Sequence, residues 1–161
     1  MIDHSPEQVA IRLEPGSTGD LDQVIAVMNS AFDDRFGEAW TRSQCAGILP
    51  MPGVVLMIAR NGVDSAIGFS LSRIIAGEAE LLLLAVAPDH RRRKVGTVLL
   101  DQFLERAREN GANRVHLEVR DGNPAVKMYR AAGFYGAGRR RKYYHGRDGS
   151  EFDALTFSRT V

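Results

Sequence analysis

The chain has 161 residues, of which 44% are hydrophobic and 25% are charged. This is the composition of a soluble globular protein long enough to bury a core, and we expect one domain over residues 1–161. Lysines and arginines number 21 and aspartates and glutamates 20, a net charge of +1, so the chain as a whole is not expected to bind polyanions strongly.

The sequence gives only indirect information on where the protein acts. Its one cysteine, Cys45, cannot form an intramolecular disulfide, which fits a reducing cytoplasm. No apolar run approaches the roughly 20 residues of a membrane span. The N-terminal residues lack the basic and apolar regions of a signal peptide. We therefore expect a cytoplasmic location and no membrane partner.

The first half of the chain predicts a strand, two helices and three strands. Residues 9–15 form the first strand, Asp20 caps a helix with apolar residues at near-helical spacing, and Thr41 caps a second, shorter helix. The three strands that follow cover residues 54–60, 66–75 and 79–88. The last of these is a near-continuous apolar run, so we expect it to be central and buried on both faces.

The second half predicts a helix, a strand, a helix and two strands. An amphipathic helix runs from about Val95 and is closed by Gly111, and a strand covers residues 113–120. Asn123 caps the next helix, which ends at Gly133. Two strands then flank a turn at residues 147–149. The whole order predicts an α/β (α+β) domain with a mixed sheet.

Four consecutive cations, Arg91-Arg92-Arg93-Lys94, connect the apolar strand to the helix that follows it. The unpaired N–H groups and the partial positive charge of a helix N-terminus favour an anion. Together with the four cations they predict a site for a pyrophosphate group. The loop has neither the Walker pattern nor a Gly-x-Gly-x-x-Gly pattern. The alternative is an ordinary solvated surface turn.

Residues 78–134 resemble the core of the GNAT superfamily of N-acetyltransferases. The acetyl-CoA loop of that family reads Arg/Gln-x-x-Gly-x-Gly/Ala, and this chain has RRRKVG there, with LLLLAVAP before it and LEVRDGNPAVKMYRAAGF after it. The resemblance implies a mixed central sheet of about seven strands with flanking helices, splayed at the central strand. It also implies acetyl-CoA as co-substrate, held by Leu84, Ala85, Val86, Arg91, Arg92, Arg93, Lys94, Val95, Gly96, Thr97 and Asn123.

A narrower resemblance links the chain to the RimI-type ribosomal-protein-alanine N-acetyltransferases. It rests on FGEAWTRSQ (residues 36–44), LEVR, RRKYY (residues 140–144) and the later Asp153-Ala154. The implied activity is acetylation of a protein N-terminal α-amine, on a partner such as a basic ribosomal protein. Two departures stand out: Lys94 replaces the first loop glycine, and the interval from Asn123 to Tyr129 is one residue shorter.

The resemblance places the catalytic base at Glu118 and the acid at Tyr129. By strand alternation Glu118 shares a face with His116 and Arg120, and its alternative role is a surface glutamate paired with Arg120 or Arg114. Tyr129 would donate a proton to the departing thiolate, since a free tyrosine has a pKa of about 10; its alternative is a core residue. The resemblance also implies that the backbone N–H of Val86 binds the developing oxyanion. We expect Cys45 to serve packing, so that transfer is direct.

The acceptor site is expected to come from the N-terminal segment and the C-terminal strands. Asp33, Asp34 and Glu38 form an acidic loop before Trp40, which would suit a basic peptide or would simply be solvated. Tyr143 and Tyr144 are further candidates, although in a regular strand one of these two would point outward.

The kind of amine follows only partly from the chemistry. An α-amine has a pKa of about 7.7–8.0 and a lysine about 10.4, so deprotonating lysine costs about 3.5 kcal/mol more. This difference favours an α-amine acceptor without deciding the matter.

Three alternatives remain open at this stage. The chain could acetylate a small-molecule amine with the same chemistry. It could be a nucleic-acid-binding module that uses RRRK and GRRRKYYH, although the net charge of +1 makes nucleic acid an unlikely partner. It could also be an inactive acyl-CoA sensor. The four histidines, at positions 4, 90, 116 and 145, show no metal-ligand spacing, so no metal is expected.

Overall fold

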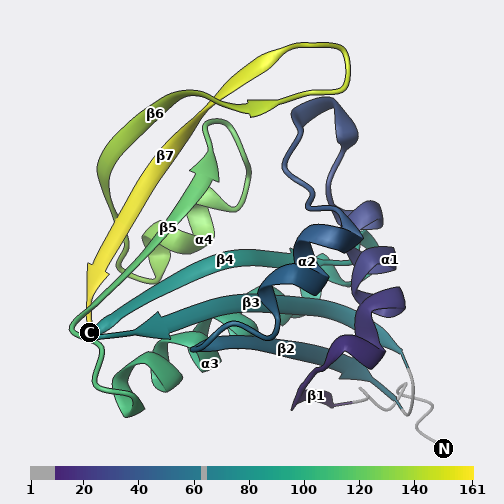
Figure 1. Cartoon of the computed structure of the whole chain (residues 1–161), viewed down its shortest axis with the longest axis vertical. Helices are drawn as coiled ribbons and strands as arrows, with labels where there is room; N and C mark the ends of the chain where they lie inside the picture. The colour runs from purple at the N-terminus through teal and green to yellow at the C-terminus, as the bar shows by residue number, and fades with distance from the viewer. Residues whose placement is uncertain (1–9, 63–64) are drawn as a thin grey trace, which may run out of the picture.

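Seven strands form one mixed sheet in the computed structural model, which describes residues 10–62 and 65–161 (Figure 1). In chain order the strands are β1 (Ile11–Pro15), β2 (Val54–Asn61), β3 (Ala66–Ile75), β4 (Glu78–Val86), β5 (Arg114–Arg120), β6 (Tyr135–His145) and β7 (Glu151–Thr160). In space their order is β1-β2-β3-β4-β5-β7-β6. The predicted fold class is confirmed, as is the number of strands implied by the resemblance.

Helices cover both faces of the sheet. They are α1 (Leu21–Ala31), α2 (Arg42–Ile48), α3 (Val95–Glu109) and α4 (Val126–Ala131), with short 3-10 turns η1 (Thr18–Asp20), η2 (Asp34–Phe36) and η3 (Pro88–Arg93). Buried residues of α1 and α2 pack with β2, β3 and β4, whereas α3 packs on the opposite face. In the described part of the chain, no helix has the length and apolarity needed to cross a bilayer.

The predicted helix caps differ in their outcome. Thr41 accepts from the Gln44 N–H at 3.2 Å, and the Gln44 side chain accepts from the Thr41 N–H at 2.8 Å, a capping box that confirms the start of α2. Asp20 is the N-cap residue of α1, as predicted, but its side chain makes no capping hydrogen bond. Its carboxylate instead accepts from the Ser17 N–H one turn earlier, where the 3-10 turn η1 precedes the helix.

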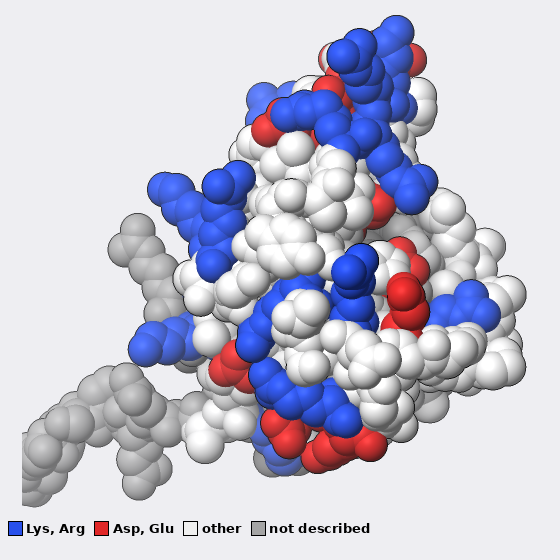
Figure 2. All heavy atoms as spheres, turned by 90° about the vertical axis from the view of Figure 1, so that its left-hand side faces the viewer, with Lys and Arg blue, Asp and Glu red and all other residues white. Residues whose placement is uncertain are grey.

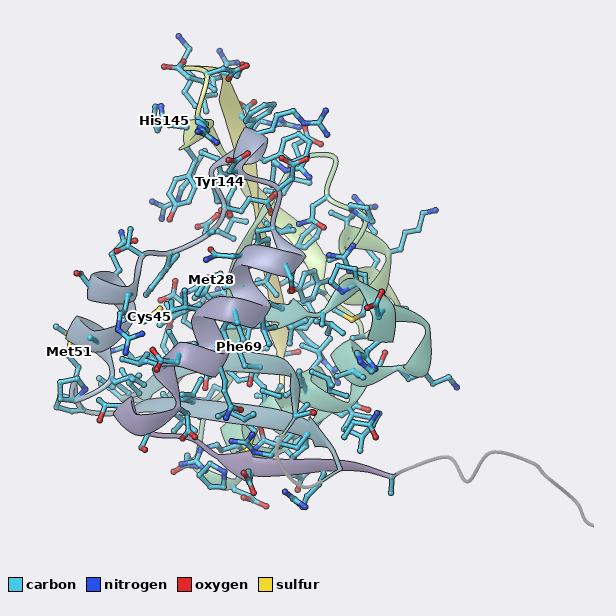
Figure 3. All side chains as sticks on the ribbon, turned by 90° about the vertical axis from the view of Figure 1, so that its right-hand side faces the viewer. Met28, Cys45, Met51, Phe69, Tyr144 and His145 are labelled. Carbon is cyan, nitrogen blue, oxygen red and sulfur yellow. The ribbon has the colours of Figure 1, made fainter. Side chains whose placement is uncertain are left out.

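Cys45 is buried between α2 and the sheet, as a packing role requires (Figure 3). Its neighbours in this cluster include Met28 of α1 and Phe69 of β3, both almost fully buried. Burial raises the pKa of the Cys45 thiol. A buried thiol that stays protonated is a poor nucleophile, so the geometry agrees with a reaction that does not pass through Cys45.

The sheet splays apart between β4 and β5. These two strands form the parallel pair of the sheet, with Glu78–Leu81 of β4 against Arg114–Leu117 of β5. Beyond Leu81 the two strands diverge, and Figure 1 shows β5 leaning away with β6 and β7. The splay at the central strand, implied by the resemblance, is confirmed. It leaves one edge of β4 without a strand partner within the described residues.

A β-bulge lies in β4 at the point where the strands diverge. Leu71 of β3 pairs with Leu83 and Ser72 pairs with Leu81, so Leu82 is an extra residue. As a result Leu81 packs in the cluster that contains α3, whereas Leu83 packs in the cluster that contains α1. The prediction of a central strand with buried residues on both faces is confirmed. The residues between the fully buried ones are half-buried, and the splay opens one edge of the strand.

Candidate active site

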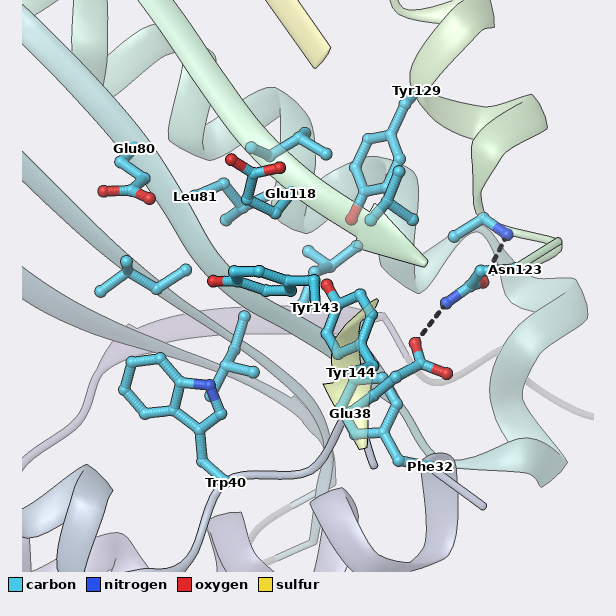
Figure 4. Close-up of a pocket in the computed structure, with 16 residues that line it drawn as sticks. Phe32, Glu38, Trp40, Glu80, Leu81, Glu118, Asn123, Tyr129, Tyr143 and Tyr144 are labelled. Carbon is cyan, nitrogen blue, oxygen red and sulfur yellow. Dashed lines mark hydrogen bonds between the residues drawn. The ribbon is translucent and has the colours of Figure 1, made fainter. Parts of the chain in front are cut away.

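Two neighbouring cavities open at the splay. The larger, of about 580 Å³, lies beside the end of β4 and the start of α3. The smaller, of about 110 Å³, lies between β4, β5 and the β6–β7 hairpin (Figure 4). Five residues line both cavities, namely Phe32, Glu38, Leu84, Asn123 and Ala125. The two spaces therefore share a wall, and groups bound in each would meet beside Leu84.

Most of the predicted cofactor residues line the larger cavity. These are Leu84, Ala85, Val86, Arg91, Lys94, Gly96, Thr97 and Asn123. Val95 does not belong with them, because its side chain is fully buried in the core against the sheet. The side chains of Arg92 and Arg93 lie outside the described residues. A cavity of this size is typical of a small-molecule site.

The basic loop forms the 3-10 turn η3 and leads directly into α3. Lys94 caps the helix with a left-handed backbone, φ +60°, so it takes the conformation usually reserved for glycine without shifting the helix start. Arg91 Nη2 donates to the carbonyl oxygen of Ala31 at 2.7 Å, which ties the loop to the end of α1. Gly96 packs closely against Met128 at the start of the helix, since an added Cβ would lie 3.1 Å from Met128 Sδ.

This arrangement fits the pyrophosphate and thioester arm of acetyl-CoA. The first turn of α3, a helix of 15 residues, presents its N–H groups beside Arg91 and Lys94. The unpaired edge of β4 runs along the same cavity through Leu84, Ala85 and Val86. The residues present can therefore hold both the charged and the amide-containing parts of such a molecule.

The smaller cavity is assembled from five elements of the fold. Phe32 and Trp40 come from the α1–α2 connection, Glu80 from β4, Glu118 from β5 and Tyr129 from α4, together with Tyr143 and Tyr144 of β6. Figure 4 shows Tyr129 and Tyr144 with their hydroxyl groups turned toward each other, and Trp40 across the cavity from them. Both predicted catalytic residues thus lie in one cavity.

Glu118 is almost buried, with 12% of its side chain exposed. The predicted alternative partners were Arg120 and Arg114, yet the carboxylate pairs with neither of them. It instead forms an ion pair with Arg140, whose Nε lies 2.9 Å from Oε1, and accepts a hydrogen bond from Thr156 Oγ1 at 2.7 Å. Reasoning from the sequence missed Thr156 entirely, and it quoted Arg140 only as part of the RRKYY motif.

Tyr129 lies in the core as well as in the cavity. It is 6% exposed and packs edge-to-face on Phe134, with ring centroids 5.9 Å apart. Burial, and then the nearby charge of Glu38, raise the pKa of Tyr129 above its ordinary value. Burial and Glu38 raise the pKa of Tyr144 in the same way. Both phenols therefore stay protonated at neutral pH and can act as proton donors.

Glu38 is buried and not part of an acidic rim. Its carboxylate accepts from Arg120 Nε at 2.7 Å and from Asn123 Nδ2 at 2.8 Å, and the Arg120 guanidinium lies 3.6 Å over the Phe36 ring. The Glu38 and Arg120 side chains are 8% and 9% exposed. Because the Asn123 carbonyl also accepts from the Ala125 N–H at 2.8 Å, both ends of its amide are already used within the protein.

The other two predicted acids lie apart from Glu38. Asp34 is exposed and pairs with Arg147 at 2.9 Å, outside both cavities, whereas Asp33 lines the larger one. The predicted acidic rim beside Trp40 was therefore wrong. The cause is the turn η2, after which Gly37 adopts φ +68° and turns Glu38 inward; a Cβ there would lie 2.0 Å from the His145 carbonyl oxygen.

Both neighbouring tyrosines of β6 line the smaller cavity, against the expectation that one would point outward. The register of β6 against β7 shifts between Arg140 and Tyr144, and Lys142 within this bulge has φ +54°. The Lys142 N–H donates to Asp153 Oδ1 at 3.0 Å, which holds the bulge in place. The bulge breaks the strand alternation, so the Tyr143 and Tyr144 rings meet edge-to-face, 4.9 Å apart.

The cations of β6 are largely neutralised by neighbouring acids. Figure 2 shows Lys and Arg side chains gathered at the top of the molecule, where the β6–β7 hairpin projects, with acidic side chains among them. Arg139 bonds Asp121 and Asp153, and Lys142 pairs with Glu151. This pairing weakens the nucleic-acid alternative, because phosphates would have to compete with carboxylates. Within residues 10–62 and 65–161, no three metal-ligating side chains cluster.

Comparisons with known proteins agree with this geometry. The [Ribosomal protein bS18]-alanine N-acetyltransferase of Escherichia coli (strain K12) is 35% identical over 99 residues, or 61% of this chain and 65% of that protein. A mycothiol acetyltransferase of Clavibacter sepedonicus is 34% identical over 103 residues, 63% of this chain and 31% of that protein. The matched segment thus spans less than two thirds of these curated relatives.

A solved structure matches over nearly the whole chain. The crystal structure of the ribosomal-protein-S18-alanine N-acetyltransferase from Escherichia coli superposes with a TM-score of 0.82 at 26% identity, covering 94% of each chain. The sequence model of the acetyltransferase (GNAT) family matches residues 21–134. That match includes both walls of the splay and the basic loop. The chain belongs to the acetyltransferase (GNAT) family.

Proposed function

We propose that this protein transfers an acetyl group from acetyl-CoA to the N-terminal α-amine of a protein. The observation that carries the proposal is the shared wall of the two cavities. One cavity fits a pyrophosphate-bearing thioester, the other holds an acid–base pair, and they meet beside Leu84 at the splay. Donor and acceptor would therefore be held next to each other, which is the main requirement of a direct transfer.

The proposed chemistry uses a small number of residues. Bound acetyl-CoA supplies an activated carbonyl on a thiolate leaving group. Glu118 takes a proton from the acceptor ammonium so that the amine can form the new C–N bond. The backbone N–H of Val86 faces the developing oxyanion, and Tyr129 donates its proton to the thiolate as the C–S bond breaks. The extra proton on the attached nitrogen leaves as the amide forms and restores the tyrosine, and Glu118 releases its proton to solvent. The products are an amide and free CoA.

The size of the smaller cavity supports a protein N-terminus with a small first residue. Its volume of about 110 Å³ is less than the roughly 150 Å³ of a cavity that holds benzene. A small side chain beside the α-amine fits, and the rest of a peptide would leave the cavity past Tyr143, which is 46% exposed. The name of the bacterial relatives points to alanine on a ribosomal protein, an acceptor that would place the reaction in the cytoplasm.

A small-molecule amine is the second candidate. The matching mycothiol acetyltransferase, by its name, is the observation that favours it. The same base, acid and cofactor cavity would serve either acceptor, since they act on the amine and the thioester only. The two proposals differ in what leaves the small cavity: a peptide extends past Tyr143, whereas a small amine ends there.

The test is CoA release from acetyl-CoA with a synthetic peptide that begins Ala-Arg and with its N-terminally blocked twin. We expect turnover with the free peptide only. Turnover with small amines but with neither peptide would mean that the protein is an acetyltransferase whose acceptor is a small amine and not a protein N-terminus. Failure to bind acetyl-CoA would contradict the proposal as a whole.

A further inference from the structure

Two side chains that do not line the acceptor cavity contact the carboxylate of Glu118. Thr156 sits directly opposite Glu118 in the β5–β7 pair, and its hydroxyl donates to Oε2. Arg140 reaches across from β6 and forms an ion pair with Glu118, its Nε 2.9 Å from Oε1. Among the described residues that line the smaller cavity, Glu118 is present while Arg140 and Thr156 are not. Each oxygen therefore has one partner that does not line the acceptor cavity.

Among the described residues, Arg140 forms an ion pair with Glu118 and with no other acid. Its neighbour Arg139 bonds Asp121 and Asp153, so the two arginines have separate partners. The Arg140 guanidinium also lies 5.7 Å from the centroid of the Tyr143 ring, a wall of the same cavity. The Arg140 side chain is 63% exposed. Its guanidinium is nevertheless restrained by the charge of Glu118 and by the face of the Tyr143 ring.

Arg140 and Thr156 could affect Glu118 as a proton acceptor in two opposite ways. A cation beside a carboxylate reduces its tendency to take a proton, which would slow the reaction. The ion pair and the hydrogen bond also hold the carboxylate in one orientation, which would speed the reaction, because small misplacements of a reacting group are costly. Glu118 lines the cavity while neither partner does, and this placement favours orientation as the larger effect.

We propose that Arg140 and Thr156 are positioning residues that aim Glu118 at the acceptor amine. This inference rests on the proposed function. Arg140→Ala and Thr156→Val should each lower kcat about 10- to 100-fold, the cost of a misplaced reacting group. The KM values for acetyl-CoA and for the peptide should stay near those of the wild type, since neither residue lines a cavity.

The experiment compares steady-state kinetics of the full chain and its variants with acetyl-CoA and the Ala-Arg peptide. Thr156→Ser keeps the hydroxyl and should keep most of kcat. Added methylguanidinium should restore activity to Arg140→Ala, whose vacated site is open to solvent, and should not help Thr156→Val. Arg141→Ala is the matched control, because Arg141 is an exposed neighbour that makes no hydrogen bond or ion pair with Glu118 in the described residues.

The outcomes separate this inference from the proposed function. An Arg140→Ala enzyme as fast as the wild type, or faster, would overturn the positioning role while leaving the transferase intact. A loss of kcat that methylguanidinium cannot restore, matched by an equal loss in Arg141→Ala, would mean a general effect of the hairpin and would also overturn it. If the wild-type chain acetylates no amine, the proposed function fails and this inference fails with it.

Discussion

The two cavities at the splay are built in different ways. One wall of the larger cavity comes from a single continuous stretch, residues 84–97, in which a strand, a turn and a helix follow one another. The smaller cavity takes its walls from four stretches, within residues 32–40, 80–84, 117–129 and 143–144. A contiguous wall depends on local structure, whereas a wall of distant segments depends on how those segments dock.

This difference gives each cavity its own sensitivity to mutation. The cofactor side should tolerate changes that keep the local turn and its charge. The acceptor side should depend on the contacts that hold the α1–α2 connection and the β6–β7 hairpin against β5. The predictions below test that contrast, beginning with the largest expected effect.

Loss of the acid–base pair should remove most of the activity without affecting the cofactor side. Glu118→Gln and Tyr129→Phe should each lower kcat about 10²- to 10⁴-fold, while acetyl-CoA binding measured by calorimetry stays unchanged. Tyr135→Phe is the control, since Tyr135 is exposed on β6 and lines neither cavity in the described residues. Full activity in either of the first two variants would remove that residue from the mechanism.

The contact that joins the α1–α2 connection to β5 should be strongly stabilising. Glu38→Ala leaves Arg120 buried without its carboxylate, so we expect the free energy of unfolding to fall by about 3–5 kcal/mol. Denaturant melts would measure this change. Asp34→Ala is the matched control from the same segment, because its pair with Arg147 is exposed and should contribute at most about 1 kcal/mol. Equal effects of the two substitutions would contradict a strongly stabilising Glu38–Arg120 ion pair.

The two buried tyrosines should make the protein sensitive to alkali. Their pKa values are raised in the folded state, so the unfolded chain loses these protons first as the pH rises above about 10. Stability is therefore fully present below pH 10 and falls above it, by about 1.4 kcal/mol per pH unit for each tyrosine. Denaturant melts between pH 9 and 11 should show a shallower decline in Tyr144→Phe, and an identical decline would contradict the burial of this phenol.

Two lysines with left-handed backbones offer a comparison between the two sides. Lys94 caps α3 and Lys142 lies in the β6 bulge, with φ +60° and +54°. Glycine removes the steric cost of this conformation, so Lys94→Gly and Lys142→Gly should each raise stability, by up to about 1 kcal/mol. Only Lys94→Gly should weaken acetyl-CoA binding, because only Lys94 lines the larger cavity. Equal weakening of acetyl-CoA binding by the two substitutions would contradict the assignment of the cofactor to the larger cavity.

Local patterns in the sequence were enough to predict the order of the elements and an anion site at the basic loop, whereas the other residues of the cofactor wall came from the family resemblance. The start of α3 after Lys94 and the cap at Thr41 follow from residues within one turn of each other. The same local reasoning found Asp20 at the start of α1 but not the partner of its carboxylate, which a preceding 3-10 turn takes. It identified β4 as a buried central strand, but a pattern of apolar residues does not reveal that a neighbouring strand diverges.

The acceptor side could be predicted only in part, and for a physical reason. Glu118 and Tyr129 came from a family resemblance. The partners of Glu118 come from later in the chain, one on β7, which pairs with β5, and one on β6, which pairs with β7. Glu38 appeared as an acid in a polar loop, and its burial depends on Arg120, 82 residues away. Tyr143 and Tyr144 face one cavity only because of the β6 bulge, and the left-handed backbone of Lys142 has no signature in the sequence.

The most direct test of the shared-wall account is the affinity of a bisubstrate compound in which CoA is joined through an acetyl linker to the N-terminus of the Ala-Arg peptide. If the two cavities are halves of one site, this compound should bind at least about 10²-fold more tightly than CoA, because the linked peptide binds at high effective concentration. Isothermal titration would measure both constants. Binding no tighter than that of CoA alone would contradict a continuous site at the splay.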